Sequence, residues 1–236
     1  MFSPVGTPLL DRTVGEIVAE VPGQSRVFQA FGIDFCCQGG RTLREACARK
    51  GISAESVVEQ LEAGVARNLE EYNPAELEAG ELADYIVRKH HRYLREELPR
   101  LLTMAARVAQ VHGGHTPSLV EVSEVLLGLA EELALHMMKE EEMLFPCITR
   151  MSRGEPIGIA LDAPIDCMLD EHVEAGAALD RLRELTNAYQ PPVEACNTYR
   201  ALFDGLADLE NDLHHHIHLE NAVLFPVALK LAEQLG

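Results

Sequence analysis

Residues 136–146 read HMMKEEEMLFP, and residues 216–226 read HIHLENAVLFP. Both stretches follow the pattern H-x-x-x-E-x-x-x-L-F-P. Because four residues make about one turn of an α-helix, each stretch is predicted to place an imidazole and a carboxylate on one helix face. A bound metal ion needs this arrangement, so the repeated stretch predicts a helical metal site. The predicted pairs are His136 with Glu140 and His216 with Glu220.

The repetition includes one further histidine in each half of the sequence. His91 precedes His136 by 45 residues, and His172 precedes His216 by 44 residues. This spacing predicts two helical hairpins, each with a lone histidine on its first helix and a histidine–glutamate pair on its second. The four helices would then direct all of these side chains to a common centre.

Composition excludes several classes of partner. The sequence of 236 residues carries 38 acidic and 20 basic side chains, a formal net charge of −18. This charge repels a phosphate backbone or an anionic lipid surface, so we expect neither a nucleic acid nor a membrane as partner. The start of the sequence lacks the pattern of a secretory signal, and no segment approaches about 18 uninterrupted apolar residues. We therefore expect a cytoplasmic protein.

The six cysteines are scattered, apart from the adjacent pair Cys36 and Cys37. Their spacing matches neither a disulfide framework nor a zinc ribbon, so reduced thiols are expected. The pair precedes a helix that should begin near Thr42, and the dipole of that helix would lower a thiol pKa. Composition leaves open the alternative that both are small buried residues.

The chain is predicted to divide into a small helical domain that carries the cysteine pair, a linker, and a longer helical domain. Capping boxes at Thr13 and Thr42 indicate the short helices of the first part. The linker is polar and contains Asn73-Pro74, which disfavours a helix. The predicted boundaries are residues 1–65 for the small domain, 66–77 for the linker and 78–236 for the longer domain.

The longer domain is predicted to be an antiparallel four-helix bundle, so the whole fold is all-α. Its longest connection, residues 151–164, lies between the two repeated halves. Pro146 and Pro226 each follow a glutamate of the repeat by six residues. They either kink the helices around the site or stand close to a helix end, and the sequence does not decide between the two.

Apolar residues share the predicted inner face of the helices with both glutamates. A carboxylate in such a place is costly unless it is paired or binds a metal ion, so Glu140 and Glu220 need partners. The alternative to a metal is a buried network of histidine–glutamate hydrogen bonds. On the last helix the apolar face is predicted to contain Leu209, Leu213, Val223, Leu224 and Val227. The side chains predicted to point away are Glu141, Glu142, His214, His215 and His218, with the three histidines in solvent or behind the ligands.

The first long helix offers two adjacent histidines. His91 shares its face with Val87 and Leu94, whereas His90 shares its face with Glu97. His91 is therefore the preferred metal ligand.

The predicted donors exceed the needs of one ion and suit two ions that both carboxylates bridge. Each ion would have two imidazoles and two carboxylate oxygens, with room for an oxo or hydroxo bridge and a small ligand. Such mixed donors favour iron, although zinc or copper would compete in vitro. A structural zinc site would instead be closed and rich in thiolates. We therefore expect a di-iron centre.

Five segments of the sequence carry a resemblance to a known family: Asp34–Cys37, Arg95–Pro99, His136–Pro146, Glu171–Gly176 and His216–Pro226. They resemble the repair-of-iron-centres (RIC) family of di-iron proteins, which join a small domain with a D-[FY]-C-C motif to a hemerythrin-like bundle. The resemblance covers nearly the whole chain. The sequence departs from the family at Gln38, which separates the cysteines from the following glycines, and at Leu94, which replaces a second histidine.

The resemblance implies a role for each matching residue. The histidines would be terminal iron ligands, the two glutamates would bridge the irons, the cysteines would be functional thiols, and Glu171 would be an acid behind the ligands. The implied iron ligands are His91, His136, His172, His216, Glu140 and Glu220. The implied thiols are Cys36 and Cys37.

The leading hypothesis is a cytoplasmic di-iron stress protein that restores iron–sulfur clusters damaged by nitric oxide or oxidants. It would supply iron to damaged iron–sulfur proteins, or bind or reduce nitric oxide. One alternative is a buffer or sensor that binds nitric oxide or dioxygen without a repair role. A weaker alternative is a di-iron oxidase.

Overall fold

The computed structural model describes residues 8–21, 24–35, 39–65 and 74–235. These residues form helices and no β-strand, with one isolated bridge between Thr13 and Thr42. The prediction of an all-α fold is therefore confirmed. Among the described residues, no helix combines the length and apolar character needed to cross a lipid bilayer.

The N-terminal part contains short helices that begin where the sequence predicts. The Thr13 hydroxyl accepts a hydrogen bond from the Glu16 amide, and the Glu16 carboxylate accepts one from the Thr13 amide. Thr42 and Glu45 form the same capping box, which satisfies amides that a helix start leaves unpaired. The helices are α1 (Val14–Glu20), α2 (Ser25–Ala30), α3 (Leu43–Lys50) and α4 (Ala54–Val65).

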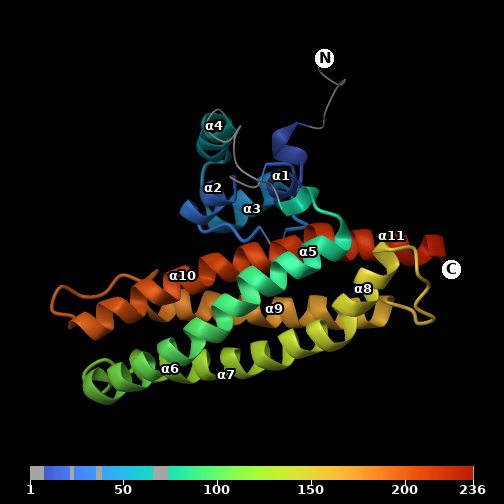
Figure 1. Cartoon of the computed structure of the whole chain (residues 1–236). Coiled ribbons are helices and arrows are strands. Elements are labelled where there is room, and N and C mark those ends of the chain that lie inside the picture. Colours follow the sequence, from blue (N-terminus) through green and yellow to red (C-terminus); the bar gives the residue numbers. More distant parts are fainter. Residues whose placement is uncertain (1–7, 22–23, 36–38, 66–73, 236) are drawn as a thin grey trace.

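The remaining described residues form a bundle of four helical rods, in which chain neighbours run antiparallel (Figure 1). Three rods change from α-helix to a single π-helical turn and back again. The first rod is α5 (Ala79–Ile86), the π turn Val87–His91 and α6 (Arg92–His112). The second is α7 (Ser118–Lys139), the π turn Glu140–Leu144 and α8 (Phe145–Ser152). The third is α9 (Asp162–Leu185), and the fourth is α10 (Asn197–Leu219), the π turn Glu220–Leu224 and α11 (Phe225–Leu235).

The π turns explain how the helices accommodate Pro146 and Pro226, and they explain one wrong prediction. Pro146 and Pro226 are the second residues of α8 and α11, where a missing backbone N–H costs little. Each π turn adds one residue relative to an α-helix, so the inward face shifts by one position after it. Val227, predicted to point inward, is 38% exposed, whereas Ala228 is fully buried.

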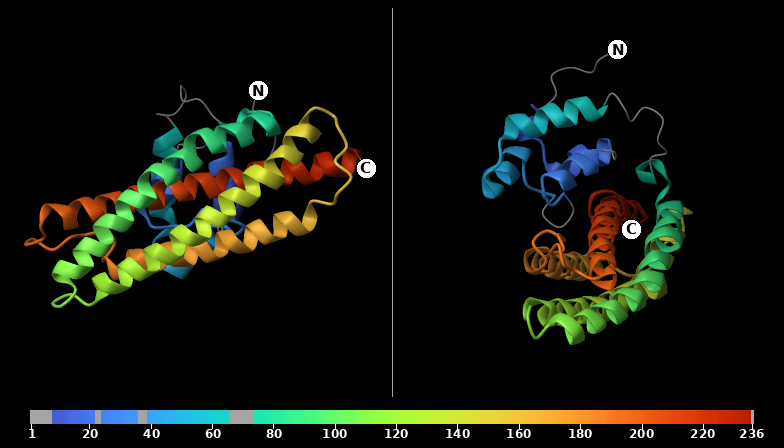
Figure 2. Two further views of the ribbon diagram at one scale, coloured as in Figure 1. Left: turned by 60° about the horizontal axis from the view of Figure 1, so that its bottom comes forward. Right: turned by 90° about the vertical axis from the view of Figure 1, so that its left-hand side faces the viewer.

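The two parts of the molecule share one hydrophobic core, which includes Phe28 and Phe35 together with Leu209 and Leu213 of α10. Figures 1 and 2 show the short N-terminal helices against the side of the bundle where α10 lies. The face of α10 that was predicted to meet solvent is therefore covered by the N-terminal part.

Phe35 makes the aromatic part of this contact. It is fully buried, and its ring centroid lies 5.7, 5.8 and 5.6 Å from those of His214, His215 and His218. We call these three histidines the Phe35 cradle. Of the two predicted alternatives, solvent or a place behind the ligands, the first is wrong for the buried His218, because the sequence does not show that the N-terminal domain packs on this helix.

Candidate metal centre

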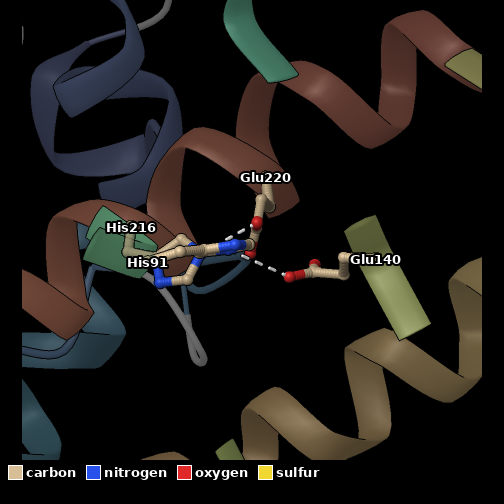
Figure 3. A group of neighbouring side chains, drawn as sticks. All are labelled: His91, Glu140, His216 and Glu220. Atoms are coloured by element: carbon tan, nitrogen blue, oxygen red, sulfur yellow. Dashed lines mark hydrogen bonds and ion pairs between the residues drawn. The ribbon is translucent and has the colours of Figure 1, made fainter. Parts of the chain in front are cut away.

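The predicted metal ligands meet inside the bundle as two overlapping groups of buried side chains. Their ligand atoms lie within 4.8 Å of one another in each group. We call His91 and His216 with both glutamates the first position, and His136 and His172 with both glutamates the second position. Glu140 and Glu220 belong to both groups, and the side chains of the first position point toward one another in Figure 3.

The π turns help to place these ligands. His91 is the last residue of the first π turn, and Glu140 and Glu220 are the first residues of the other two. π turns inside α-helices are often found at functional sites. His136 and His216 precede their glutamates by one helical turn, as the sequence predicts, and α9 supplies the remaining histidine.

Each carboxylate offers one oxygen to each position. Glu140 Oε2 lies 3.3 Å from His91 Nε2, and its Oε1 lies 3.3 Å from His136 Nε2. Glu220 Oε1 lies 3.0 Å from His216 Nε2, and its Oε2 lies 3.1 Å from His172 Nε2. Two cations, one at each position, would therefore share both carboxylates.

The arrangement of these nitrogen and oxygen atoms suits bound cations better than hydrogen bonds among the side chains. Both oxygens of Glu140 and Oε2 of Glu220 are buried, and although imidazole nitrogens lie 3.1–3.3 Å from them, no described residue donates a hydrogen bond of good geometry to them. The Nε2 atoms of His91 and His216 lie 3.2 Å apart, and those of His136 and His172 lie 3.1 Å apart. A network of hydrogen bonds alone leaves buried acceptors unsatisfied, which is costly, whereas bound cations would use all of them.

Two of the four imidazoles are oriented by carboxylates. His91 Nδ1 lies 2.6 Å from Oε1 of Glu141, which also accepts a hydrogen bond from Arg95 at 2.7 Å. Glu141 was predicted to point away from the site, because a regular α-helix would turn this side chain outward and no periodicity marks the π turn. Such a partner fixes the tautomer and the orientation of a metal-binding imidazole.

The corresponding partner of His136 is Glu171. His136 Nδ1 lies 2.9 Å from Oε2 of Glu171, and the other carboxylate oxygen pairs with Lys139. His172 has a neutral partner, because its Nδ1 lies 2.7 Å from the side-chain oxygen of Asn221. Glu171 therefore lies behind the imidazoles, against His136.

Aromatic rings support three of the imidazoles. Phe145 stacks on His91 and Phe225 stacks on His172, with ring centroids 5.8 and 6.0 Å apart, so the L-F-P segments of the repeat pack on the site. His90 is not among the grouped donors and instead stacks on His216, with centroids 5.4 Å apart. Of the two adjacent histidines, the structure thus brings His91 to the centre.

Without metal, the site has the electrostatics of buried ion pairs. Burial alone would lower the pKa of His136, but Glu140 and further carboxylates outweigh it and raise that pKa to about 9. Burial alone would raise the pKa of Glu220, but His216 and His172 hold it well below its usual range. Glu220 is therefore charged and ready to bind a cation.

A small cavity reaches the second position. Its volume is about 110 Å³, and its lining includes His136, His172, Lys139 and Glu171. A water-sized or diatomic molecule would fit such a space.

Cys36 and Cys37 lie outside the described residues. The structure fixes the chain on both sides of them: Phe35 is held by its cradle, and the carbonyl of Gly39 accepts a hydrogen bond from Gly15 N at 2.9 Å. A Cβ atom at residue 15 would lie 3.1 Å from that carbonyl oxygen, so glycine suits this close approach.

Two family models match separate parts of the chain. Residues 10–64 match the ScdA_N family, described as a domain of unknown function (DUF542). Residues 82–228 match the hemerythrin HHE cation binding domain.

Curated relatives match nearly the whole chain. An iron-sulfur cluster repair protein ScdA of Staphylococcus haemolyticus is 36% identical over 90% of this chain and 95% of its own length. Iron-sulfur cluster repair proteins YtfE of Pectobacterium atrosepticum and Edwardsiella ictaluri are 37% and 40% identical, each over 93% of this chain and 97% of their own lengths.

Proposed function

We infer the function from one premise: the chain belongs to the family of iron-sulfur cluster repair proteins that join an ScdA_N domain to a hemerythrin HHE domain. We propose that it repairs iron–sulfur clusters damaged by nitrosative or oxidative stress. It would act by donating iron, by binding or reducing nitric oxide, or by both. Its partners would be damaged iron–sulfur proteins, and nitric oxide or dioxygen would be its small ligand.

The observation that carries this proposal is the pair of buried His–His–Glu–Glu groups that share both carboxylates. We propose that they hold two iron ions, with the histidines as terminal ligands and Glu140 and Glu220 as bridging ligands. Iron with imidazole and carboxylate donors and open positions supplies redox chemistry and binds diatomic ligands. The cavity beside the second position is consistent with a ligand of that size.

The surrounding residues would orient the ligands and exclude water. Glu141 and Glu171 would accept hydrogen bonds from the Nδ1–H groups of His91 and His136 and so hold the imidazoles in the metal-binding tautomer. The stacked rings of Phe145 and Phe225 would keep two ligand rings in place and cover them with apolar surface.

The cysteine pair is the proposed contact with the damaged partner. Cys36 and Cys37 directly follow Phe35, which is anchored on the helix that carries His216 and Glu220. Thiols near the bundle could receive outgoing iron or meet a nitrosylated cluster. A cytoplasmic location is part of the proposal, because Cys47, Cys147, Cys167 and Cys196 are free thiols, as expected in a reducing compartment.

The test combines metal analysis with a repair assay. The variant that carries both Glu140→Gln and Glu220→Gln keeps the size of the side chains, but it removes the charge and replaces one oxygen of each carboxylate with an NH2 group that cannot bind a metal ion. We expect the wild-type protein to bind two irons and to reactivate a nitrosylated iron–sulfur dehydratase, and the variant to lose both properties. The readouts are iron content, near-ultraviolet absorption and recovered dehydratase activity.

Glu142→Gln is the matched control, because Glu142 lies two residues after Glu140 but is exposed. It should keep both irons and full repair. The proposal would be overturned by a double variant that still holds two irons and repairs the cluster. A wild-type protein that binds iron and nitric oxide without reactivating the dehydratase would contradict the repair function.

A further inference from the structure

The four imidazoles differ in what their second ring nitrogen contacts. An imidazole that binds a metal through Nε2 carries a proton on Nδ1, and that N–H needs an acceptor when it is buried. His91 and His136 have carboxylate partners, and His172 has an amide oxygen. Three of the four histidines therefore have an acceptor for the Nδ1–H group that metal binding through Nε2 requires.

His216 is the exception. The side chain is 1% exposed, and among the described residues its Nδ1 has no hydrogen-bond partner. One face of the ring is covered by the parallel ring of His90. Asp212 lies one helical turn before His216, but its carboxylate is 2.9 Å from His90 Nδ1. It is therefore the hydrogen-bond partner of His90 and not of His216.

This difference separates the two metal positions. Both histidines of the second position have Nδ1 partners, whereas at the first position His91 has one and His216 has none among the residues that the structure describes. Both positions share the same two carboxylates, so the carboxylates do not compensate for the difference. Removing such an outer partner typically costs about 10–100-fold in metal affinity.

We propose that the two positions bind iron unequally, and that the iron held by His91 and His216 is the exchangeable one. Its dissociation constant is about 10–100-fold larger than that at the second position. This inference rests on the proposed function, which it deepens, because it names the iron that the protein would donate. It also separates two tasks: the second position retains its metal beside the small cavity, and the first position releases its metal.

The first position also lies next to the N-terminal domain. Phe35 contacts His215, which directly precedes His216 in the sequence, and His218, two residues after His216. Iron that leaves the first position therefore starts from the helix on which the N-terminal domain is docked.

The test measures equilibrium affinity, because release rates would also depend on the cavity that reaches the second position. Anaerobic titration of the full-length metal-free protein with Fe(II) should show two binding steps whose dissociation constants differ by about 10–100-fold. Asn221→Ala removes the partner of His172 without removing a ligand. It should weaken the tighter step by about 10–100-fold and bring the two steps together.

Asn211→Ala is the matched control, because Asn211 has an exposed side chain on α10. It should leave both steps unchanged. A second pair of variants assigns the steps: His91→Ala with His216→Ala leaves only the second position, and His136→Ala with His172→Ala leaves only the first. The former should bind its single iron more tightly.

Equal affinities in the wild type, or tighter binding at the first position, would overturn the inference. If the ligand variants fail to fold, the wild type and Asn221→Ala still decide it, because a tighter step that Asn221→Ala leaves unchanged contradicts it. Failure of the proposed function looks different, since unequal iron binding without repair of a nitrosylated enzyme rejects the function alone.

Discussion

Phe35 is the residue that best shows how the two parts of the molecule are joined. It is fully buried, and it contacts Phe28 of its own domain as well as the cradle on α10. Burial lowers the pKa of His218 to about 4, so this histidine is neutral at physiological pH. It therefore gives Phe35 an uncharged aromatic surface to pack against.

Replacing Phe35 with alanine should destabilise the protein. Loss of a buried phenylalanine typically costs about 3–5 kcal/mol in the free energy of unfolding. Urea unfolding followed by circular dichroism would measure this change. Val193→Ala is the control, because Val193 is 91% exposed, and its effect should stay within about 0.5 kcal/mol. A loss below about 1 kcal/mol for Phe35→Ala would show that the cradle is not an important contact.

At the scale of single residues, the sequence predicts the candidate metal ligands but not the side chains that contact those ligands. His136 and Glu140 could be identified because a separation of four residues places them on one helix face. Glu141 and the cradle could not, because their contacts depend on a π turn and on the docking of a separate domain. His90 illustrates the same limit, since its stacking on His216 joins two helices that are far apart in the sequence.

The π turns are the elements that distinguish this bundle from four regular helices. Two of them begin at the shared glutamates and one ends at His91. A single added residue makes a π turn, while the helix on either side keeps its packing. The sequence predicts the helices from their apolar periodicity but contains no clear signal for the turns. The wrong prediction at Val227 follows from that.

Deleting Met143 should therefore disrupt the metal site without disrupting the fold. Met143 lies within the π turn Glu140–Leu144, and its side chain is 67% exposed. Without the added residue the rod can continue as a regular α-helix, which keeps the bundle but moves the carboxylate of Glu140. We expect normal helicity by circular dichroism and loss of bound iron in metal analysis.

The control for the deletion is Met143→Ala, which keeps the chain length. It should retain both irons and change the stability by no more than about 0.5 kcal/mol. A deletion variant that still binds two irons would show that the π turn is not required to place Glu140.

On the scale of the whole molecule, each metal position draws ligands from both halves of the bundle. The first position takes His91 and Glu140 from one half and His216 and Glu220 from the other, and the second position is built in the same way. The repeat in the sequence predicts this symmetry. It does not predict where the N-terminal domain sits, because nothing in the polar segment 66–77 indicates which face of the bundle that domain covers.

Removing the metal should lower the thermal stability of the protein. A ligand that binds only the folded state stabilises it by about 2.7 kcal/mol at a free concentration of 100 times its dissociation constant. The Tm of the wild type should rise when Fe(II) is added under argon. The Tm of the Glu140→Gln, Glu220→Gln double variant should not respond. Equal Tm values for metal-free and metal-loaded wild type would contradict this expectation.

Residues 153–161 form an exposed connection between the two halves of the bundle. Most of its side chains are exposed, and Gly154 and Gly158 adopt positive φ angles of 77° and 69° in its turns. Exposed loops of this kind are preferred sites of proteolytic cleavage. An ion at either position would act as a non-covalent cross-link between the two fragments of a chain cut there. The bound ions would then help to hold the nicked protein together, and their loss would leave the fragments joined by apolar packing and by polar pairs such as His136–Glu171 and His90–Asp212.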